Sequence, residues 1–336
     1  MWLLKIIGFP ISVIYGVVVW VRNYCYDKGI FSSSSFKTPT VCIGNLSVGG
    51  TGKTPMVEFL VRSLQDEYKV AILSRGYGRK SKGYVQANNL STVEELGDEP
   101  YQIHQKFPKI SFSVDANRRE GVQRIEAEIK PDVILLDDAY QHRKVKASSY
   151  ILLTAYYNLY VNDWFLPTGS LRDAKVQAAR ASVIIVTKCP RTLSIEEQQQ
   201  LTRKLNPLPH QQVLFSYLGY ASEVKNEDAH TLPLEALKDK KVCLVTGIAN
   251  AAPLVAYLKE KGVAVEHLEY RDHHFFTDKE IEIFNTKAFV LTTEKDFVRL
   301  KGKVTKLYYL EIEHCFLGNG ATQLKQEVIK LLNPNS

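Results

Sequence analysis

The glycine-rich stretch SVGGTGKT, residues 47–54, constrains the fold of this chain most strongly. It stands between an apolar strand-like run and a helical pattern. It matches the phosphate-binding loop G-x-x-x-x-G-K-S/T, except that Ser47 replaces the first glycine. Backbone N–H groups of such a loop, and the start of the following helix, hold phosphate oxygens. We therefore predict that a nucleoside triphosphate contacts Ser47, Val48, Gly49, Gly50, Thr51, Gly52, Lys53 and Thr54. The Lys53 ammonium is expected at the β- and γ-phosphates, and the Thr54 hydroxyl at Mg²⁺.

An acidic pair follows a second apolar run. Residues 132–138 read DVILLDD, which places Asp137 and Asp138 at the end of a predicted strand. Phosphoryl-transfer sites combine a phosphate loop with an acid at a strand end, so these carboxylates are candidate Mg²⁺ ligands. The alternative is that they only cap the next turn. His142 follows closely enough to contact phosphate at the same edge, although a lone histidine is more often an ordinary surface residue.

Three further clusters carry charged side chains on turns. SRGYGR, residues 74–79, has no complete dinucleotide fingerprint, because Ser81 stands where the last glycine is needed. Arg75 and Arg79 are interpreted as contacts for an acidic substrate or phosphate, against the alternative of a solvated basic turn. The two acids of GDEP, residues 97–100, could simply cap a helix. In DHH, residues 272–274, the carboxylate can orient a histidine as a proton acceptor, and the spacing does not favour a metal site.

The order of apolar runs predicts the fold class. Helical patterns such as 54–65 and 116–129 alternate with strand-like runs at 40–44, 69–74, 110–114, 133–136, 150–154 and 183–187. Continuous apolar strands between amphipathic helices indicate an α/β fold, with a mostly parallel sheet covered on both faces. Prolines at 207 and 209 indicate a boundary, after which strand-like runs recur at 242–246, 263–268, 288–292 and 306–311. We expect an N-terminal membrane-associated helix in residues 1–30, a P-loop domain in 31–209 and a smaller α/β domain in 210–336.

The N-terminal segment is unusually apolar. Residues 6–21, IIGFPISVIYGVVVWV, are apolar except for Ser12, and Lys5 and Arg22 flank them. A cleaved signal peptide needs small residues at its cleavage site, and RNYC follows instead. A full transmembrane span needs about 20 apolar residues, and this run is slightly shorter and contains Pro10. A helix in the membrane interface fits the length and the basic flanks, and a buried core helix is the alternative.

Net charge and cysteine spacing narrow the classes of partner. The formal charge of +7 suggests an anionic partner. The sequence contains no RNA-recognition signature, zinc finger or basic heptad pattern, so we expect no nucleic-acid partner. The 5 cysteines are scattered and form no C-x-x-C pair. We interpret them as small buried residues of a protein in a reducing compartment.

Seven motifs in one order along the chain carry a resemblance to a known family. They are SVGGTGKTP (47–55), SRGYGR (74–79), GDEP (97–100), DVILLDDAYQH (132–142), LPTGSLRD (166–173), DHHFFT (272–277) and TEKD (293–296). Together with the N-terminal helix they resemble the tetraacyldisaccharide 4'-kinase family, the lipid A 4'-kinases, over nearly the whole chain. The resemblance implies an ATP- and Mg²⁺-dependent kinase that phosphorylates the 4'-hydroxyl of an acylated glucosamine disaccharide 1-phosphate in lipid A biosynthesis.

The resemblance also implies an architecture and a location. The fold would be a P-loop α/β/α core joined to a smaller α/β/α domain, with the active site in the cleft between them. The enzyme would act at the cytoplasmic face of the inner membrane, attached there by its N-terminal helix. Its expected partners are the lipid-linked disaccharide and inner-membrane lipids, with no obligate protein partner.

Position by position, the resemblance assigns a role to each site residue. Lys53 and Thr54 match the phosphate-loop lysine and the metal-binding threonine, Asp137 and Asp138 match the metal-binding acids, and His142 is expected near the phosphates. Asp98 matches the acid that deprotonates the 4'-hydroxyl, with His273 as its helper, and Glu99 assists with Mg²⁺. Arg172 is expected at the nucleotide phosphates or the transition state, and Arg118 and Arg119 at the 1-phosphate of the disaccharide.

Two positions depart from the family's motifs. Ala139 replaces a glycine after the acid pair, which matters if that residue needs a positive φ, and Ser170 replaces a proline in LPTGSLRD. Two other functions fit the same phosphate loop. One is a membrane-associated nucleotide switch, since TKCP (187–190) and TEKD (293–296) are each partly similar to a guanine-reading motif. The other is a kinase of a different membrane-bound sugar or polyprenol, which would differ only in its acceptor pocket.

Overall fold

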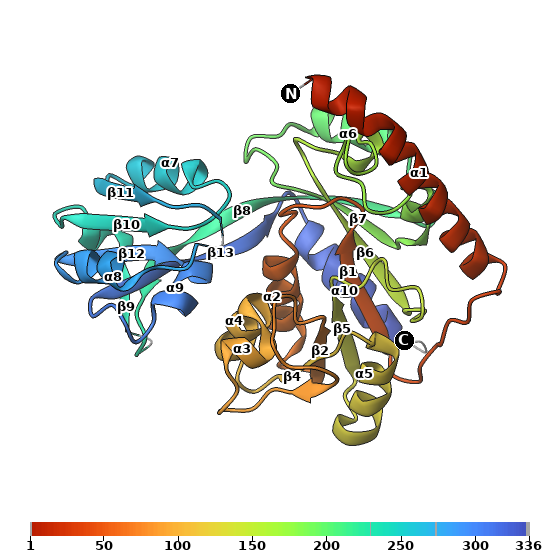
Figure 1. The fold of residues 1–336 in the computed structure, drawn as a ribbon, viewed down its shortest axis with the longest axis horizontal. Helices are drawn as coiled ribbons and strands as arrows, with labels where there is room; N and C mark the ends of the chain where they lie inside the picture. Colours follow the sequence, from red (N-terminus) through yellow and green to blue (C-terminus); the bar gives the residue numbers. More distant parts are fainter. Residues whose placement is uncertain (1, 229, 273, 334–336) are drawn as a thin grey trace. The chain divides into compact units, whose positions relative to one another are not determined.

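The chain divides into two compact units. The computed structural model describes residues 2–228, 230–272 and 274–333. Unit 1 contains Met1–Leu218 and His314–Ser336, and unit 2 contains Gly219–Glu313 (Figure 1). The expected boundary at residue 209 lies before the long strand β8 (Gln212–Lys225), whose first half still belongs to unit 1. The C-terminal helix α10 (Gly320–Leu332) also belongs to unit 1, so the chain returns to unit 1 after it has formed unit 2. This return was not predicted from the sequence.

Unit 1 is built on a mostly parallel sheet, so the predicted α/β fold class is confirmed. Its strand order is β8-β7-β6-β1-β5-β2-β4-β3, and each neighbouring pair is parallel except β3 with β4. The strands besides β8 are β1 (Thr40–Asn45), β2 (Val70–Ser74), β3 (Val85–Gln86), β4 (Ser111–Val114), β5 (Val133–Asp137), β6 (Ser149–Ala155) and β7 (Val183–Thr187). The six strand ranges predicted for this part of the chain match to within one residue at each end.

Both faces of this sheet are buried, which explains why its strands read as continuous apolar runs. Successive residues of a strand point to opposite faces, and Val41 and Ile43 belong to one core cluster while Cys42 belongs to the other. The helices of unit 1 are α1 (Trp2–Asp27), α2 (Lys53–Leu64), α3 (Val93–Leu96), α4 (Asp98–Lys106), α5 (Arg118–Arg124), α6 (Ile195–Leu205) and α10 (Gly320–Leu332), with short turns η1 (Ile125–Ile129), η2 (Tyr160–Asn162) and η3 (Lys175–Arg180).

The C-terminal helix α10 is part of the core beneath the phosphate loop. Its Leu324 and Val328 are buried in the same cluster as Met56 and Leu60 of α2. Apolar side chains spaced four apart on each helix therefore meet across one interface. The amphipathic pattern of α10 is visible in the sequence, but nothing in it specifies that α2 is its neighbour.

Unit 2 is a smaller α/β unit. Its parallel strands follow the order β11-β10-β12-β13, and β9 pairs with β8 in antiparallel fashion. Its elements are β9 (Thr231–Pro233), η4 (Leu234–Leu237), β10 (Val242–Thr246), α7 (Ala252–Glu260), β11 (Val265–Glu269), α8 (Asp278–Asn285), β12 (Phe289–Thr293), α9 (Glu294–Leu300) and β13 (Leu307–Phe316). The last residues of β13, from His314 onward, belong to unit 1.

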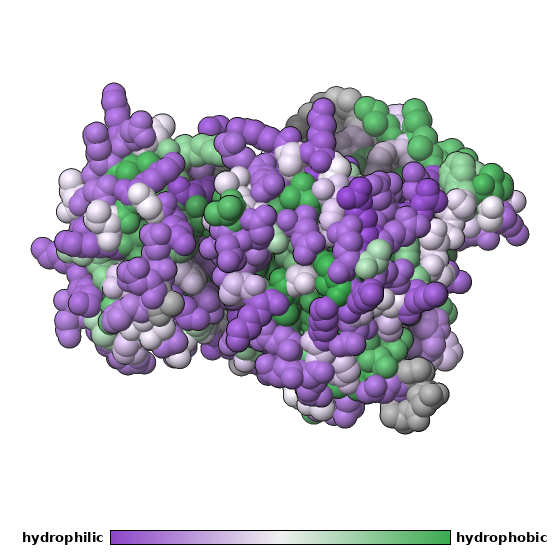
Figure 2. All heavy atoms as spheres, turned by 90° about the horizontal axis from the view of Figure 1, so that it is seen from below, coloured by the Kyte–Doolittle hydropathy of each residue, from purple (hydrophilic) through white to green (hydrophobic). Residues whose placement is uncertain are grey.

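The apolar N-terminal segment forms the long helix α1. Among the described residues, no helix combines the length and apolarity that crossing a membrane requires. Apolar side chains that are 44–65% exposed lie along its outer side, namely Phe9, Ile11, Val13, Ile14, Val17, Val18, Trp20, Val21 and Tyr24. Figure 2 shows green apolar atoms along this part of the molecule, at the upper right of the view. The opposite side of α1, with Ser12, Val19 and Asn23, is buried.

Candidate active site

The phosphate loop has the backbone that its glycines allow. It connects the end of β1 at Asn45 to the start of α2 at Lys53. Gly49 and Gly52 have φ angles of 111° and 86°, a region that side-chain-bearing residues rarely occupy. A Cβ added to Gly52 would also lie 2.8 Å from the Nε2 atom of His314. Glycine is therefore required at Gly52 both for its backbone angles and for space.

Buried side chains support the loop from the sheet side. The Nε2 atom of His314 lies 2.8 Å from the carbonyl oxygen of Gly52, and its Nδ1 lies 3.1 Å from the Ser216 hydroxyl. Burial lowers the pKa of His314 to about 4, so the ring is neutral at pH 7, with Nε2 donating and Nδ1 accepting. The Thr187 hydroxyl donates to the carbonyl of Thr51 at 2.8 Å. These bonds fix the loop without using the N–H groups that would face phosphate.

Lys53 lies in a cluster of polar groups at the carboxyl edge of the sheet. Its Nζ is 3.8 Å from a carboxylate oxygen of Asp138 and 3.5 Å from the side-chain oxygen of Asn45. Arg172 pairs with the same carboxylate and donates to Asn45 at 2.6 Å. Burial alone would raise the pKa of Asp138, but Lys53 and Arg172 hold it below its usual range. Asp138 is thus ionised between two cations, as a site for phosphate and metal requires.

Asp137 is in a different electrostatic environment from Asp138. It ends β5 and is 5% exposed, and its carboxylate accepts a hydrogen bond from the Ser74 hydroxyl at 2.9 Å. Burial, followed by the charges of Asp138 and Glu99, raises its pKa to about 6. Repulsion from two neighbouring carboxylates thus adds to the effect of burial on Asp137.

The GDEP motif lies against both the phosphate loop and the SRGYGR turn. Asp98 begins α4, and the Thr54 hydroxyl donates to the carboxylate of Glu99 at 3.0 Å. A Cβ added to Gly97 would lie 2.7 Å from the carbonyl oxygen of Tyr77, so these two motifs pack in close contact. The structure therefore brings together Thr54, the acids of GDEP and the basic turn that follows β2.

The predicted substrate arginines differ in their surroundings. Arg75 is exposed and Arg119 is half-buried. Arg118 is 3% exposed, and its guanidinium donates to the carbonyls of Ala116 and Asp138 at 3.2 and 3.3 Å. Arg79 donates to the carbonyls of Val114 and Gly83, at 3.3 and 2.6 Å, and so holds the turn together.

His142 is held near this edge by its backbone. Its N–H donates to the carbonyl of Ala139 at 2.8 Å. Burial, followed by the charge of Arg118, lowers its pKa to about 4, so the ring is neutral. The buried Nε2 atom has no hydrogen-bond partner among the described residues. A buried ring nitrogen of this kind can receive a ligand atom or a water.

The DHH motif lies in unit 2, and its first histidine, His273, lies outside the described residues. His274 stacks on Tyr270, and its Nε2 is 3.1 Å from the carboxylate oxygens of Glu280. Asp272 pairs with Lys295 at 3.3 Å. Asp296 of TEKD accepts from the N–H of Gly247 at 2.8 Å and from the Thr293 hydroxyl, so this motif stabilises its own helix start and an adjacent loop.

The two departures from the family's motifs have local explanations. Positive φ occurs at Asp138 (47°) and, in the described part of the chain, not at Ala139. Alanine therefore meets no backbone strain at this position. The N–H of Ser170 donates to Asp163 at 3.1 Å, a bond that a proline could not make, and its hydroxyl contacts the same carboxylate.

Lys188, which follows β7, was considered only within TKCP, the motif partly similar to a guanine-reading sequence, and not as a residue of the phosphate site. It has a φ of 57°, and its Nζ lies 3.8 Å from the position of a Cβ on Gly50. Burial lowers its pKa, and no acidic partner is found for it in the portion of the chain that the structure describes. A lysine directly after an apolar strand, as in Thr187-Lys188, could have indicated a site residue. Only the fold shows that Lys188 lies beside the phosphate loop. Asn45 was missed as well, although its position at the end of β1 could have indicated it.

The described residues contain no preformed metal-binding cluster. Among residues 2–228, 230–272 and 274–333, no group of three or more His, Cys, Asp or Glu side chains could hold an ion by itself. The 5 cysteines are free, and Cys42, Cys189 and Cys243 are buried. A metal at Asp137 and Asp138 would therefore share its coordination with a ligand, which is how Mg²⁺ usually binds beside nucleotide phosphates.

Comparison with known proteins identifies the family. The model of the tetraacyldisaccharide-1-P 4'-kinase family matches residues 4–333. The tetraacyldisaccharide 4'-kinase of Flavobacterium johnsoniae is 48% identical over 323 residues, covering 94% of each chain. That of Bacteroides thetaiotaomicron is 41% identical and covers 98% of this chain and 93% of its own.

A solved structure agrees with these relatives. The crystal structure of the apo form of LpxK from Aquifex aeolicus in complex with ATP superposes with a TM-score of 0.80 and 28% identity, covering 96% of this chain and 98% of that one. The family model, the relatives and the solved structure all match nearly the full length of this chain. The chain therefore belongs to the tetraacyldisaccharide-1-phosphate 4'-kinase family.

Proposed function

We propose that this kinase transfers the γ-phosphoryl group of ATP to the 4'-hydroxyl of an acylated glucosamine disaccharide 1-phosphate, a step of lipid A biosynthesis. The observation that carries the proposal is the cluster of Lys53, Asp138 and Arg172 at the mouth of the phosphate loop. Phosphoryl transfer depends mainly on positioning and charge neutralisation, and this cluster supplies cations where the γ-phosphate would lie. The family relationship supports ATP as donor and a lipid-linked disaccharide as acceptor.

The phosphate side of the reaction is assigned to the loop and three basic side chains. The N–H of Val48 donates to the carbonyl of Ser170 at 2.7 Å, so the other N–H groups of residues 47–54 and the start of α2 would hold the β- and γ-phosphates. Lys53 and Arg172 would neutralise the transferred group, and Lys188 would lie along the loop as an additional cation for the nucleotide. His142 offers its unpartnered ring nitrogen to a phosphate oxygen or its water.

Mg²⁺ fits the acidic corner of the site. Repulsion from Asp138 and Glu99 contributes to the raised pKa of Asp137, and a divalent cation would relieve that repulsion. Asp137, Asp138 and Thr54 would hold the ion, with Glu99 assisting through its hydrogen bond to Thr54. When bound, Mg²⁺ neutralises charge on the phosphates.

The acceptor side is assigned to the GDEP motif and the nearby arginines. Asp98 would accept the proton of the 4'-hydroxyl, because it begins α4 next to Glu99 and the phosphate loop. Arg75, Arg118 and Arg119 would bind the acidic end of the disaccharide, while Arg79 shapes the turn. The assistance of His273 to Asp98 stays a prediction.

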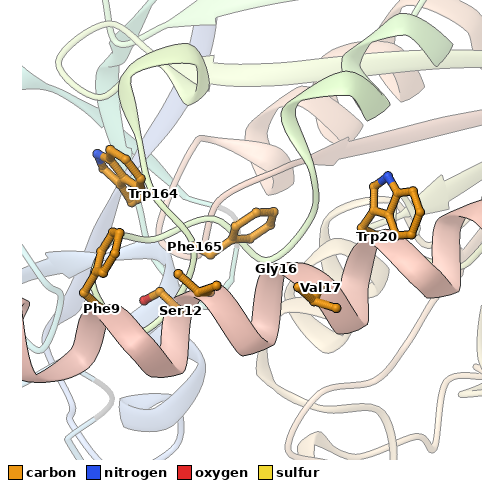
Figure 3. Close-up of a pocket in the computed structure, with 8 residues that line it drawn as sticks. Phe9, Ser12, Gly16, Val17, Trp20, Trp164 and Phe165 are labelled. Atoms are coloured by element: carbon orange, nitrogen blue, oxygen red, sulfur yellow. The ribbon is translucent and has the colours of Figure 1, made fainter.

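The helix α1 gives the enzyme a surface for its lipid substrate. The apolar pocket of about 270 Å³ shown in Figure 3 is lined by Phe9, Val17 and Trp20 of α1 and by Trp164 and Phe165. Such a pocket suits an acyl chain, and the exposed apolar side of α1 suits the bilayer that holds the other chains. These features support action at a membrane surface, and the family relationship supports the cytoplasmic face of the inner membrane as that surface.

Replacing Val18 with glutamate should weaken binding to vesicles. Val18 is 61% exposed on the apolar side of α1, and a carboxylate there would have to enter the membrane interface. We expect at least a ~10-fold lower partition into vesicles that contain anionic lipid. Sedimentation with vesicles measures this, and Val176→Glu, at a site that is 68% exposed on η3, is the control. Equal partition of the Val18 variant and the parent protein would contradict the membrane assignment.

Replacing Asp137 with asparagine should stabilise the metal-free protein at neutral pH. The folded pKa of about 6 lies above the ordinary aspartate pKa of 3.8, so the unfavourable charge appears as pH rises between these values and is fully present above them. Asparagine keeps an acceptor for Ser74 and removes the charge, which should raise stability by roughly 1–3 kcal/mol at pH 7.5. Thermal unfolding with a chelator at pH 7.5 and below pH 4 measures this. A gain of the same size at both pH values would contradict the electrostatic cause.

Transfer of radiolabel from [γ-³²P]ATP to a panel of lipid acceptors tests the function directly. We expect label on the tetraacylated disaccharide 1-phosphate at its 4' position, in a reaction that requires Mg²⁺. Preferential labelling of another sugar lipid or a polyprenol would instead indicate a different membrane-bound kinase. ATP hydrolysis that needs no acceptor, together with nucleotide-dependent binding of a partner, would indicate a switch.

A further inference from the structure

The helix α1 is joined to the active site through its buried side. We call residues 163–173 the arginine loop. This segment contains the LPTGSLRD motif and therefore Arg172. The Ser12 hydroxyl donates to the Thr168 hydroxyl at 2.7 Å, and the Tyr15 hydroxyl donates to the carbonyl oxygen of Arg172 at 3.1 Å. A Cβ added to Gly16 would lie 2.8 Å from the ring of Phe165. Figure 3 shows the side chain of Phe165 against α1 at Gly16.

A further contact between α1 and the arginine loop joins two buried side chains, Asn23 and Asp173. Asn23 is 3% exposed, and its amide donates to a carboxylate oxygen of Asp173 at 2.7 Å. Asp173 is fully buried, and the same oxygen accepts the N–H of Ala174 at 2.8 Å. Its other oxygen has no hydrogen-bond partner in the described structure, and the nearest cation, Arg180, is 4.0 Å away. Because a buried carboxylate that loses a hydrogen-bond donor is costly, the position of Asp173 depends strongly on each of its few donors.

The residue before Asp173 is Arg172, whose guanidinium pairs with Asp138 and donates to Asn45. The N–H of Arg172 donates to the carbonyl of Leu46 at 2.8 Å. On the other side, α1 holds the main chain through Tyr15 at the carbonyl of Arg172 and through Asn23 at the next side chain. Arg22 makes a parallel contact with the carbonyl of Gln141, whose side chain donates to the carbonyl of Asn45 at 2.7 Å. The helix that presents an apolar side to solvent thus also fixes the backbone that carries the active-site arginine.

We propose that α1 is a positioning element for phosphoryl transfer, and that Asn23 is a positioning residue that holds Arg172 in place through Asp173. The inference rests on the role given to Arg172 under the proposed function. It assigns α1 a task separate from membrane attachment, since Asn23 faces the arginine loop and not the apolar outer side. A misplaced guanidinium costs rate because stabilisation of the transferred phosphoryl group depends on geometry fixed to a fraction of an ångström.

A double-mutant cycle with the full-length enzyme and detergent-dispersed acceptor tests this inference. Asn23→Ala should lower kcat by about 10- to 100-fold and change the KM for ATP by less than about 2-fold. In an Arg172→Ala background the same substitution should have an effect of less than about 2-fold, because the group that Asn23 positions is gone. Asn89→Ala, which removes an exposed amide from a turn, is the matched control and should leave kcat unchanged.

A second measurement reports on the loop without requiring catalysis. Asn23→Ala should increase hydrogen–deuterium exchange of the amides in residues 166–173, while exchange in β5 stays at the parent level. Asn23→Asp should be more damaging, because it places two carboxylates together, and the exchanged pair Asn23→Asp with Asp173→Asn should recover most of the lost kcat.

Equal loss of kcat in the parent and Arg172→Ala backgrounds, with unchanged exchange in the arginine loop, would overturn the inference. Failure of the proposed function gives a different pattern. In that case the parent enzyme would not label the acceptor, or Arg172→Ala alone would leave kcat unchanged, while the exchange experiment would still show whether Asn23 holds the loop.

Discussion

Lys53→Ala should lower kcat by at least about 100-fold, the usual cost of removing a group that stabilises charge in a transition state. Lys53 begins α2 and lies 3.8 Å from Asp138 and 3.5 Å from Asn45, so its ammonium stands at the mouth of the phosphate loop. Arg172 remains paired with Asp138 in the variant, which should preserve the local structure. Steady-state transfer from ATP to the disaccharide acceptor measures the loss.

The control for this variant is Lys204→Ala. Lys204 is an exposed lysine on α6, so its removal changes the net charge equally and should leave turnover unchanged. Thermal unfolding of both variants in the presence of a chelator checks that each retains its fold. If Lys53→Ala retained more than about a tenth of parental kcat, Lys53 could not be the main cation at the transferred phosphate.

Asp98→Asn should also reduce turnover by about 100-fold or more, while the affinity for ATP changes by less than about 2-fold. A general base is needed for proton removal from the acceptor hydroxyl but not for binding the donor nucleotide. The backbone before Asp98 is closely packed, because Gly97 has a φ of 95° and lies against the carbonyl of Tyr77. The amide side chain should therefore occupy the same place as the carboxylate.

Glu94→Gln is the matched control for this substitution. Its carboxylate forms an exposed ion pair with Lys80 at 2.8 Å, on the helix that precedes α4, and such pairs contribute little. We expect near-parental kcat for the control. Near-parental kcat for Asp98→Asn, with normal ATP binding, would instead remove Asp98 from the role of base and direct attention to Glu99.

The parts of the fold that follow from local pattern could be predicted from the sequence. The six predicted strands of unit 1 are apolar because both of their faces are buried, and their limits match to within one residue. The strands β3 and β8 of the same sheet were not predicted. The phosphate loop could be predicted because its glycines and Lys53 are consecutive in sequence. Asp137 and Asp138 could be predicted for the same reason, since the acid pair directly ends a strand.

The parts that depend on distant contacts could not be predicted. His314 and Ser216 support Gly52 from two other strands, and neither residue stands in a recognisable motif. Lys188 becomes a candidate only when β7 is placed near the loop. In the sequence Asn23 is one polar residue shortly after the apolar run 6–21. Its pairing with Asp173 joins positions that are 150 residues apart. The spacing of apolar residues predicts which side of a helix or strand is buried, but it does not predict which distant residue packs against that side.

The contact between His314 and Gly52 joins residues that are 262 positions apart, and it has a consequence for synthesis of the protein. The ribosome makes the phosphate loop first, and the histidine behind it follows 262 positions later. The α10 side chains that pack on α2 are made later still. Contacts of such long sequence separation are slow to form, because the entropy of closing the intervening loop opposes them. A nascent chain that has passed the phosphate loop but not α10 contains the complete nucleotide motif and lacks the side chains that support it, so we expect it to bind nucleotide more weakly than the chain that includes α10.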